Sequence, residues 1–352
     1  MISVKAPARI CFFGDHQDYL DLPVIAGTIN RYIYIQGKPN NKKAFFIQLT
    51  DVNIDVNINL NENFNIIKKD DYLRSVLFVL KKAGFTFEEG YDVEITGNIP
   101  INAGLSSSSS LVVAWIRFLL TSINRENEVS DKHIGEWAYA AEVTFFNQPG
   151  GLMDQYTIAQ GGLLFIDTLS TKVQRLRADF GSLVIAESGI AKQTLSVLQN
   201  ARSFGCSAIA AVESKVPGFN IHQANRREYK KHLSHVPQKY RDHWYAAIHN
   251  HLLTQKARTM LSGIYQDLSQ LGTWMNAHQQ ILEDRIQNTP LVMQKQIRAA
   301  REAGALGAKI IGSGGGGCMV AMVSDNTKEK VIQAFLNTGA KKAYEISLTS
   351  HS

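Results

Sequence analysis

A loop built almost entirely from glycine and serine stands between an extended segment and a long apolar one. The loop is Gly104-Leu-Ser-Ser-Ser-Ser-Ser110. Residues 91–100 before it have the character of a strand, and residues 107–124 have the apolar content of a buried helix. The order therefore predicts a strand, a loop and a buried helix in succession.

Such a loop points several backbone N–H groups and hydroxyls at one spot at the start of a helix. The helix dipole adds partial positive charge there, so the spot suits a phosphate group. The Walker pattern Gly-x-x-x-x-Gly-Lys-Ser/Thr, with its lysine, is absent. A serine-rich linker with an N-capping residue is the alternative, although a linker does not normally separate a strand from a buried helix.

The composition is that of a globular protein. The chain has 352 residues, enough for two domains or one large one, and 45% of them are hydrophobic. The formal net charge of +6 would steer anionic substrates toward the surface. The densest basic stretch, residues 225–232, matches no nucleic-acid module and is interpreted as a solvated helix face, so no nucleic-acid partner is expected.

The three cysteines (Cys11, Cys206 and Cys318) are widely spaced, and they form neither a disulfide framework nor a zinc pattern. No apolar stretch reaches 18 residues, so no membrane span is expected. The first nine residues lack the apolar core of a signal peptide. These features favour a reducing, cytoplasmic location. Monomer and dimer both remain open.

Hydrophobic periodicity divides the chain into strands, a helical middle and strands again. Residues 1–60 have mostly the pattern of strands, and residues 190–304 are mainly helical in pattern. The other expected elements are helices over 70–83, 132–146 and 327–338 and strands over 161–167, 308–311, 318–323 and 342–348. This order predicts an α+β fold rather than a doubly wound sheet. We expect two domains, residues 1–178 and 179–352.

A second motif places charged groups on one short turn. A strand would deliver Arg9 and end near Gly14, and the turn that follows presents Asp15, His16 and Asp18 together. Two carboxylates so close must be solvated or paired with a ligand. Carboxylates with free lone pairs are the acceptors that sugar hydroxyls need. A surface Asx turn is the alternative.

A third motif is the glycine run Gly312-Ser-Gly-Gly-Gly-Gly317, which lies between two apolar strands. Such a loop can bring bare backbone close to another group. A plain flexible turn would have the same composition, so the run by itself decides little.

The three motifs in this order resemble those of the GHMP small-molecule kinases, and among these most closely the galactokinases. The resemblance covers almost the whole chain. Pro149-Gly-Gly-Leu-Met-Asp-Gln155 is similar to the segment that holds the catalytic aspartate of that family, and Glu142 stands twelve residues before Asp154, as it does there.

The resemblance implies a first domain like ribosomal protein S5 domain 2, a ferredoxin-like second domain, and an active site in the cleft between them. It implies an ATP- and Mg²⁺-dependent sugar kinase in which Asp154 receives the proton of the sugar hydroxyl beside Arg9. The remaining implied roles are phosphate binding by Gly104, Leu105, Ser106, Ser107, Ser108 and Ser109, metal binding by Ser108 and Glu142, and substrate binding by Asp15, His16, Asp18, Gly151, Gly314 and Gly315.

The sequence departs from the family pattern at positions that bind the sugar in galactokinases. Asp15 stands where galactokinases carry glutamate, Gln17 replaces the usual threonine, and residues 188–207 offer no tyrosine, although the family brings a sugar-contacting one from there. We therefore expect a kinase that phosphorylates a sugar hydroxyl, the anomeric one, with the identity of the sugar open. A heptose or amino-sugar kinase and a non-catalytic sugar and ATP sensor are the alternatives.

Overall fold

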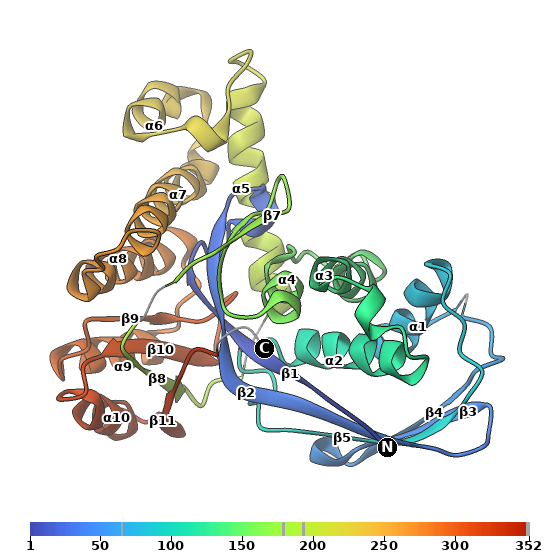
Figure 1. Ribbon diagram of the computed structural model, residues 1–352. Helices are drawn as coiled ribbons and strands as arrows, with labels where there is room; N and C mark the ends of the chain where they lie inside the picture. Colours follow the sequence, from blue (N-terminus) through green and yellow to red (C-terminus); the bar gives the residue numbers. More distant parts are fainter. Residues whose placement is uncertain (65, 178–179, 192–193, 350–352) are drawn as a thin grey trace.

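The strands of the protein form two sheets, and helices pack against both (Figure 1). The computed structural model describes residues 1–64, 66–177, 180–191 and 194–349. Seven of the strands make the first sheet and four make the second. Strands dominate the first and last parts of the chain and helices the middle, which is the α+β arrangement that the sequence predicts.

The first sheet is built around two long strands that pair along most of their length. Its members are β1 (Ile2–Phe13), β2 (Val24–Pro39), β3 (Ala44–Leu49), β4 (Ile54–Asn59), β5 (Tyr91–Gly97), β6 (Leu163–Asp167) and β7 (Lys172–Arg175). The order is β4-β3-β5-β2-β6-β7, with β1 paired to β2. β3 and β5 are parallel, whereas the other pairings within this sheet are antiparallel.

Four helices follow within the same part of the chain: α1 (Tyr72–Lys82), α2 (Ser107–Ser122), α3 (Asp131–Tyr139) and α4 (Met153–Gln160). The apolar run after the Gly/Ser loop gives α2 more buried residues than any of the other three, and Trp115 and Phe118 stack in the core at 5.3 Å between ring centroids. The helix begins at Ser107, where the sequence predicts it, and ends two residues early.

The expected helix over 132–146 is interrupted. Its α-helical part ends at Tyr139, and one turn of π-helix follows at Ala140–Thr144. Such single π turns occur often at functional sites because they re-aim side chains. This turn carries Glu142.

The second sheet contains β8 (Ser182–Glu187), β9 (Gly307–Ile310), β10 (Cys318–Val323) and β11 (Lys342–Ile346), in the antiparallel order β11-β8-β10-β9. Alternate residues of β10 face opposite sides: Met319 and Ala321 pack with α9 (Leu291–Glu302) and α10 (Lys328–Asn337). Val320 and Met322 face the first sheet. β8 is not among the strands expected from the sequence.

The two sheets share one hydrophobic core. Phe12, Phe13 and Ile25 from the first sheet pack in the same cluster as Val320 and Met322 from the second. After β11 the chain returns to the first sheet, where residues 348 and 349 pair with residues 29 and 28 of β2. The boundary expected at 178/179 lies outside the described residues.

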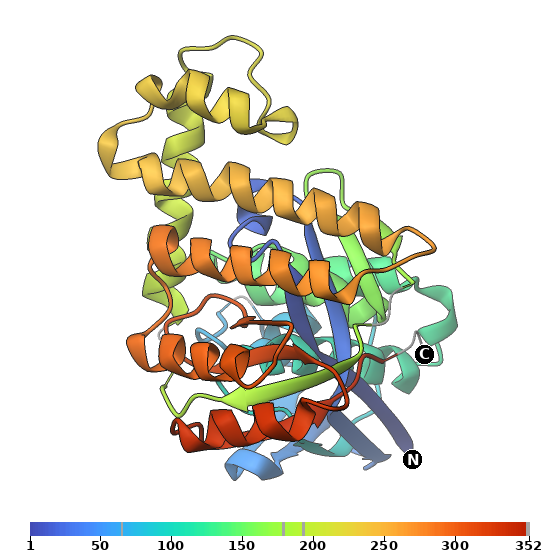
Figure 2. The same cartoon turned by 90° about the vertical axis from the view of Figure 1, so that its left-hand side faces the viewer.

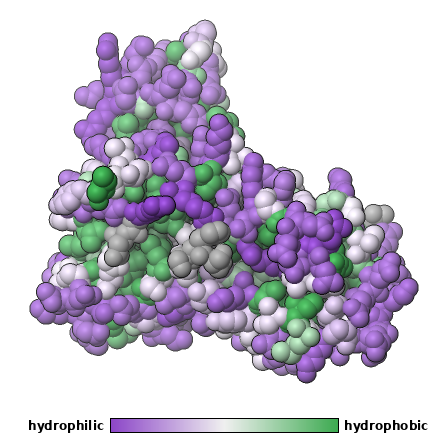
Figure 3. Space-filling model, viewed as in Figure 1, coloured by the Kyte–Doolittle hydropathy of each residue, from purple (hydrophilic) through white to green (hydrophobic). Residues whose placement is uncertain are grey.

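The helical middle consists of α5 (Thr194–Glu213), α6 (Arg226–His232), α7 (Arg241–Leu261) and α8 (Leu268–Ile281). In Figure 2, α7 and α8 run side by side above the second sheet. α6 lies at the end of the helical part that projects away from both sheets. Hydrophilic side chains cover most of this projection in Figure 3. Among the described residues, no helix is both long and apolar enough to cross a membrane.

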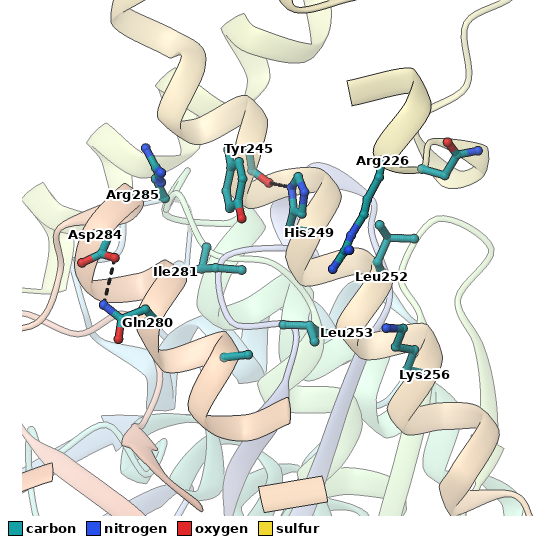
Figure 4. A pocket seen from close by; sticks show the side chains of 12 residues that line it. Arg226, Tyr245, His249, Leu252, Leu253, Lys256, Gln280, Ile281, Asp284 and Arg285 are labelled. Atoms are coloured by element: carbon teal, nitrogen blue, oxygen red, sulfur yellow. Dashed lines mark hydrogen bonds between the residues drawn. The ribbon is translucent and has the colours of Figure 1, made fainter. Parts of the chain in front are cut away.

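A hollow of about 660 Å³ opens among α6, α7 and α8, with Arg226, His249 and Gln280 on its wall (Figure 4). The predicted site residues all belong to the part of the chain that the structure describes, and none of them lines this hollow. Most of them gather instead in a smaller cavity between the two sheets.

Candidate active site

A cavity of about 210 Å³ lies where the turn after β1, the Gly/Ser loop, the start of α4 and the β9–β10 loop meet. It brings together most of the residues that the sequence singles out. Those on its wall are Arg9, Asp15, His16, Asp18, Gly104, Ser106, Ser107, Ser108, Ser109, Glu142, Gly151 and Asp154. Leu105 is fully buried and does not line it.

Arg9 and Asp154 form a two-pronged ion pair in this cavity. Arg9 Nε donates to Asp154 Oδ1 and Nη2 donates to Oδ2, both at 2.7 Å. Arg9 Nη1 donates to the carbonyl oxygen of Gly104 at 2.7 Å. Burial by itself would lower the pKa of Arg9, but the charge of Asp154 outweighs it and the pKa is raised. The pair therefore stays charged and fixes the orientation of the Asp154 carboxylate.

The loop before α2 turns sharply at Ser106. This residue has φ +60°, a left-handed conformation that costs energy in a residue other than glycine. Its hydroxyl donates to Asp154 Oδ2 and makes no capping bond to α2. The first N–H groups of a helix have no acceptor within that helix, so those at the start of α2 can receive an anion.

Glu142 on the π turn faces the first turn of α2. Its carboxylate is buried and accepts a hydrogen bond from Gln155 Nε2 at 2.7 Å. Burial raises the pKa of Glu142, while hydrogen bonds from Gln155, Ser108 and Ser109 oppose the rise. A serine hydroxyl and a carboxylate in contact are hard oxygen donors, so Ser108 and Glu142 fit a Mg²⁺ ion that keeps other ligands from water or phosphate.

The turn after β1 carries the three predicted sugar-binding side chains, and two of them are engaged by the protein itself. Asp15 Oδ2 accepts from Lys309 Nζ at 2.7 Å and Oδ1 accepts from the Gly312 N–H at 3.0 Å. His16 contacts the Tyr19 hydroxyl through Nδ1 and the Asn288 amide through Nε2, at 2.7 and 2.9 Å.

Asp18 points the other way, toward Asp154. Its Oδ1 accepts from the Tyr19 N–H at 3.0 Å. Burial, and next to it the charge of Asp154, raises the pKa of Asp18 to about 7. A Cβ atom on Gly151 would come within 2.2 Å of Asp18 Oδ2, so only glycine leaves room for this carboxylate.

The glycine run packs against the chain's own backbone. A Cβ atom on Gly314 would lie 2.4 Å from the carbonyl oxygen of Asn288, and the Gly315 N–H donates to that same oxygen at 2.6 Å. Neither Gly314 nor Gly315 lines the cavity, although both were expected to bind substrate; Gly312 and Ser313 line it instead.

Sequence reasoning did not single out three residues that shape the site. Lys309 is fully buried beside Asp15, Gln155 holds Glu142, and Asn288 contacts both the turn and the glycine run. A signal for Lys309 exists in the sequence, because it is a charged residue inside the apolar run 308–311. The other two carry no local signal.

Comparisons with known proteins agree with this fold and with the family that the motifs resemble. Three family descriptions match: "GHMP kinases N terminal domain" at residues 65–162, "GHMP kinases C terminal" at 256–341, and "Galactokinase galactose-binding signature" at 2–39. Galactokinase of Clostridium acetobutylicum is 28% identical over 94% of this chain and 87% of its own. Galactokinase of Thermococcus kodakarensis is 26% identical over 93% of this chain and 91% of its own.

Solved structures show the same fold. Lactococcus lactis galactokinase complexed with galactose matches with a TM-score of 0.89 at 20% identity, over 99% of this chain and 94% of that one. Methanococcus jannaschii mevalonate kinase matches with a TM-score of 0.76 at 17% identity, over 99% of this chain and 98% of that one. The chain belongs to the GHMP kinases, a superfamily of phosphotransferases. Within that superfamily it is a galactokinase-like sugar kinase.

Proposed function

We propose that this protein transfers the γ-phosphoryl group of ATP to the anomeric hydroxyl of a free sugar of the galactose type, with Mg²⁺. The observation that carries the proposal is the position of Asp154. Its carboxylate is held by Arg9 and Ser106 at the mouth of the Gly/Ser loop, and it faces Asp18 across the cavity. An acceptor hydroxyl bound here would lie between a carboxylate and the bound phosphates.

The reaction follows from these contacts. The sugar oxygen forms a bond to the γ-phosphorus, and the bond from that phosphorus to the β,γ-bridging oxygen breaks, so that ADP leaves. Asp154 accepts the proton of the sugar hydroxyl. Arg9 and the first N–H groups of α2 stabilise the charge on the transferred group, because phosphoryl transfer depends chiefly on positioning and charge neutralisation. Mg²⁺ held by Ser108 and Glu142 would neutralise phosphate charge.

Asp18 is the proposed sugar-binding side chain, as a hydrogen-bond acceptor for a hydroxyl close to the reacting one. The facing carboxylates of Asp18 and Asp154 disfavour an acceptor that carries its own carboxylate, such as mevalonate, because like charges would repel it. The galactose-binding signature over residues 2–39 favours a galactose-type acceptor.

The test is ADP release from ATP in the presence of a panel of free sugars: galactose, glucose, mannose, galactosamine and a heptose. Turnover is expected with galactose or a close relative, and NMR of the product should show phosphorus coupled to the anomeric proton. Tight sugar binding without turnover on any member would contradict the proposal and favour the sensor. Phosphorus on another carbon would contradict the anomeric assignment alone.

A further inference from the structure

Lys309 is the only lysine among the fully buried side chains of the described residues. It lies on β9 of the second sheet, and its ammonium contacts three oxygens: Asp15 Oδ2 at 2.7 Å, the Cys11 carbonyl at 3.1 Å and the Ile310 carbonyl at 2.6 Å. Three acceptors around a buried ammonium satisfy each of its three protons.

Asp15 is equally buried and equally satisfied. Neither side chain of the Lys309–Asp15 pair has any exposed surface, and 294 residues separate the two in sequence. The second oxygen of Asp15 receives the Gly312 N–H. Burial opposes ionisation of Asp15, but the charge and hydrogen bond of Lys309, together with the nearby His278 and His16, outweigh it and the pKa of Asp15 is lowered. A buried charge pair of this kind is costly to break from one side.

Besides Lys309, two histidines, His278 and His16, act electrostatically on Asp15 and lower its pKa. His278 packs nearby, but burial and the charge of Lys309 lower its pKa to about 3, so it is neutral. Arg9, the other buried cation of the region, is paired with Asp154. Lys309 therefore has Asp15 as its charge partner, and Asp15 has Lys309.

The next two residues of the turn also form hydrogen bonds with residues from the later part of the chain. His16 contacts Asn288, and Gln17 Nε2 donates to the Ala247 carbonyl while its Oε1 accepts from Thr254. Asp18 lies beside Gly151, shortly before the start of α4, and lines the same cavity as Asp154, whose charge raises the pKa of Asp18. Residues 15–17 are thus anchored by other parts of the protein, whereas the Asp18 carboxylate lies against Gly151 in the cavity.

We infer that Lys309 is a positioning residue of the sugar site, which holds Asp15 and with it the whole turn so that Asp18 faces Asp154. The inference rests on the proposed function. It assigns Asp15 an indirect role in place of direct contact with the sugar. It also gives a reason for aspartate at this position: a further methylene, about 1.5 Å, would force Lys309 or Gly312 aside in a space that is already filled.

The experiment compares Lys309→Met, Asp15→Asn and the double variant with the wild type, and Lys330→Met, an exposed lysine on α10, is the control. The variants are expected to raise KM for the sugar by about 10-fold or more and KM for ATP by no more than about 3-fold, since a displaced turn weakens sugar binding selectively. The Tm increase on saturation with galactose should shrink in parallel, and Lys330→Met should match the wild type.

A second panel separates positioning from direct contact. If Asp15 acts through the turn, Asp15→Asn should reduce kcat/KM by a similar factor for galactose and for its deoxy analogues. A loss confined to sugars that carry one particular hydroxyl would overturn the inference, because that pattern means direct contact. If the Lys309 and Asp15 variants have a lowered Tm but a sugar KM within about twofold of wild type, the inference is also overturned, because that result means a purely structural role for the pair.

Lys309→Met leaves an unpaired buried carboxylate and can fail to fold. The double variant removes both charges, so it is expected to unfold at a higher temperature than Lys309→Met and to share the sugar KM of Asp15→Asn. A double variant with wild-type sugar affinity would contradict the inference. Lack of sugar turnover by the wild type would instead contradict the proposed function.

Discussion

At the scale of single residues, Asp154 is held by two parts of the chain that lie far from it in sequence. Arg9 reaches it from the first strand and Ser106 from the Gly/Ser loop, so three hydrogen bonds orient one carboxylate. The proposed acceptor of the sugar proton is thereby held at the phosphate end of the cavity before any ligand binds.

Replacing Asp154 with asparagine should lower kcat by about 10²-fold or more, because the amide cannot accept the proton of the sugar hydroxyl. Binding of ATP should change little, since the substitution removes only the proton acceptor and its charge and leaves the first N–H groups of α2 in place. Steady-state kinetics and a nucleotide titration check this, with Asp55→Asn, an exposed position on β4, as the matched control. A rate close to wild type would remove Asp154 from its proposed role.

Asp18 gives a pH-dependent prediction. Its pKa of about 7 in the folded protein lies above the ordinary value of 3.8, so the folded state binds more protons between these values. Stability must then fall as the pH rises through this window, because the buried carboxylate has to ionise. The Asp18→Asn variant has no carboxylate at this position and therefore does not lose stability in this way.

The difference in Tm between Asp18→Asn and wild type should therefore increase from pH 4.5 to pH 8, by about 2–4 °C for each kcal/mol. Thermal unfolding at several pH values without sugar measures it. A difference that is constant with pH, or that decreases toward pH 8, would show that the fold does not raise the pKa of Asp18.

At the scale of elements, the start of α4 determines where Asp18 can lie. The helix begins at Met153, and its N-cap Leu152 follows two glycines, Gly150 and Gly151, that differ in their surroundings. A Cβ atom on Gly151 would collide with Asp18 at 2.2 Å, whereas a Cβ atom on Gly150 would make an ordinary contact with Val143 at 3.8 Å.

Gly151→Ala should therefore displace the Asp18 carboxylate and raise KM for the sugar several-fold, with a loss of stability of about 1–3 kcal/mol from overpacking. Gly150→Ala, one residue earlier, should have a much smaller effect on both quantities. Kinetics and denaturant unfolding of the two variants test the contrast, and equal effects would mean that the contact between Gly151 and Asp18 does not matter.

At the scale of the whole molecule, the shared core joins the two sheets. Phe12 and Phe13 of β1 and Val320 and Met322 of β10 belong to one cluster, and residues 348–349 pair back to β2. Each half of the chain would expose its part of this core if the other half were missing.

We therefore expect that residues 1–178 and 179–352, produced separately, do not fold into stable units, and that the two pieces together recover cooperative unfolding. Circular dichroism and thermal unfolding of each piece and of the mixture provide the measurement. A cooperative transition in either piece alone would show that the expected domains are independent.

The sequence alone determined the elements and much of the site's composition. The apolar run 318–323 after the glycine run predicts β10, and the Gly/Ser loop predicts the start of α2 at Ser107, because both patterns are encoded in a few adjacent residues. The ordered motifs also predict the superfamily. Local patterns did not reveal β8 or the π turn at 140–144, since both depend on what packs against them.

The tertiary structure alone decided which groups meet. Asp15 and Lys309 are 294 residues apart, and Arg9 and Asp154 are 145 apart. Whether a carboxylate binds a sugar or a buried lysine depends on which strand packs beside it, and that follows from how the two sheets bury their common core. Side-chain types are therefore visible in the sequence, whereas their partners are set by long-range packing.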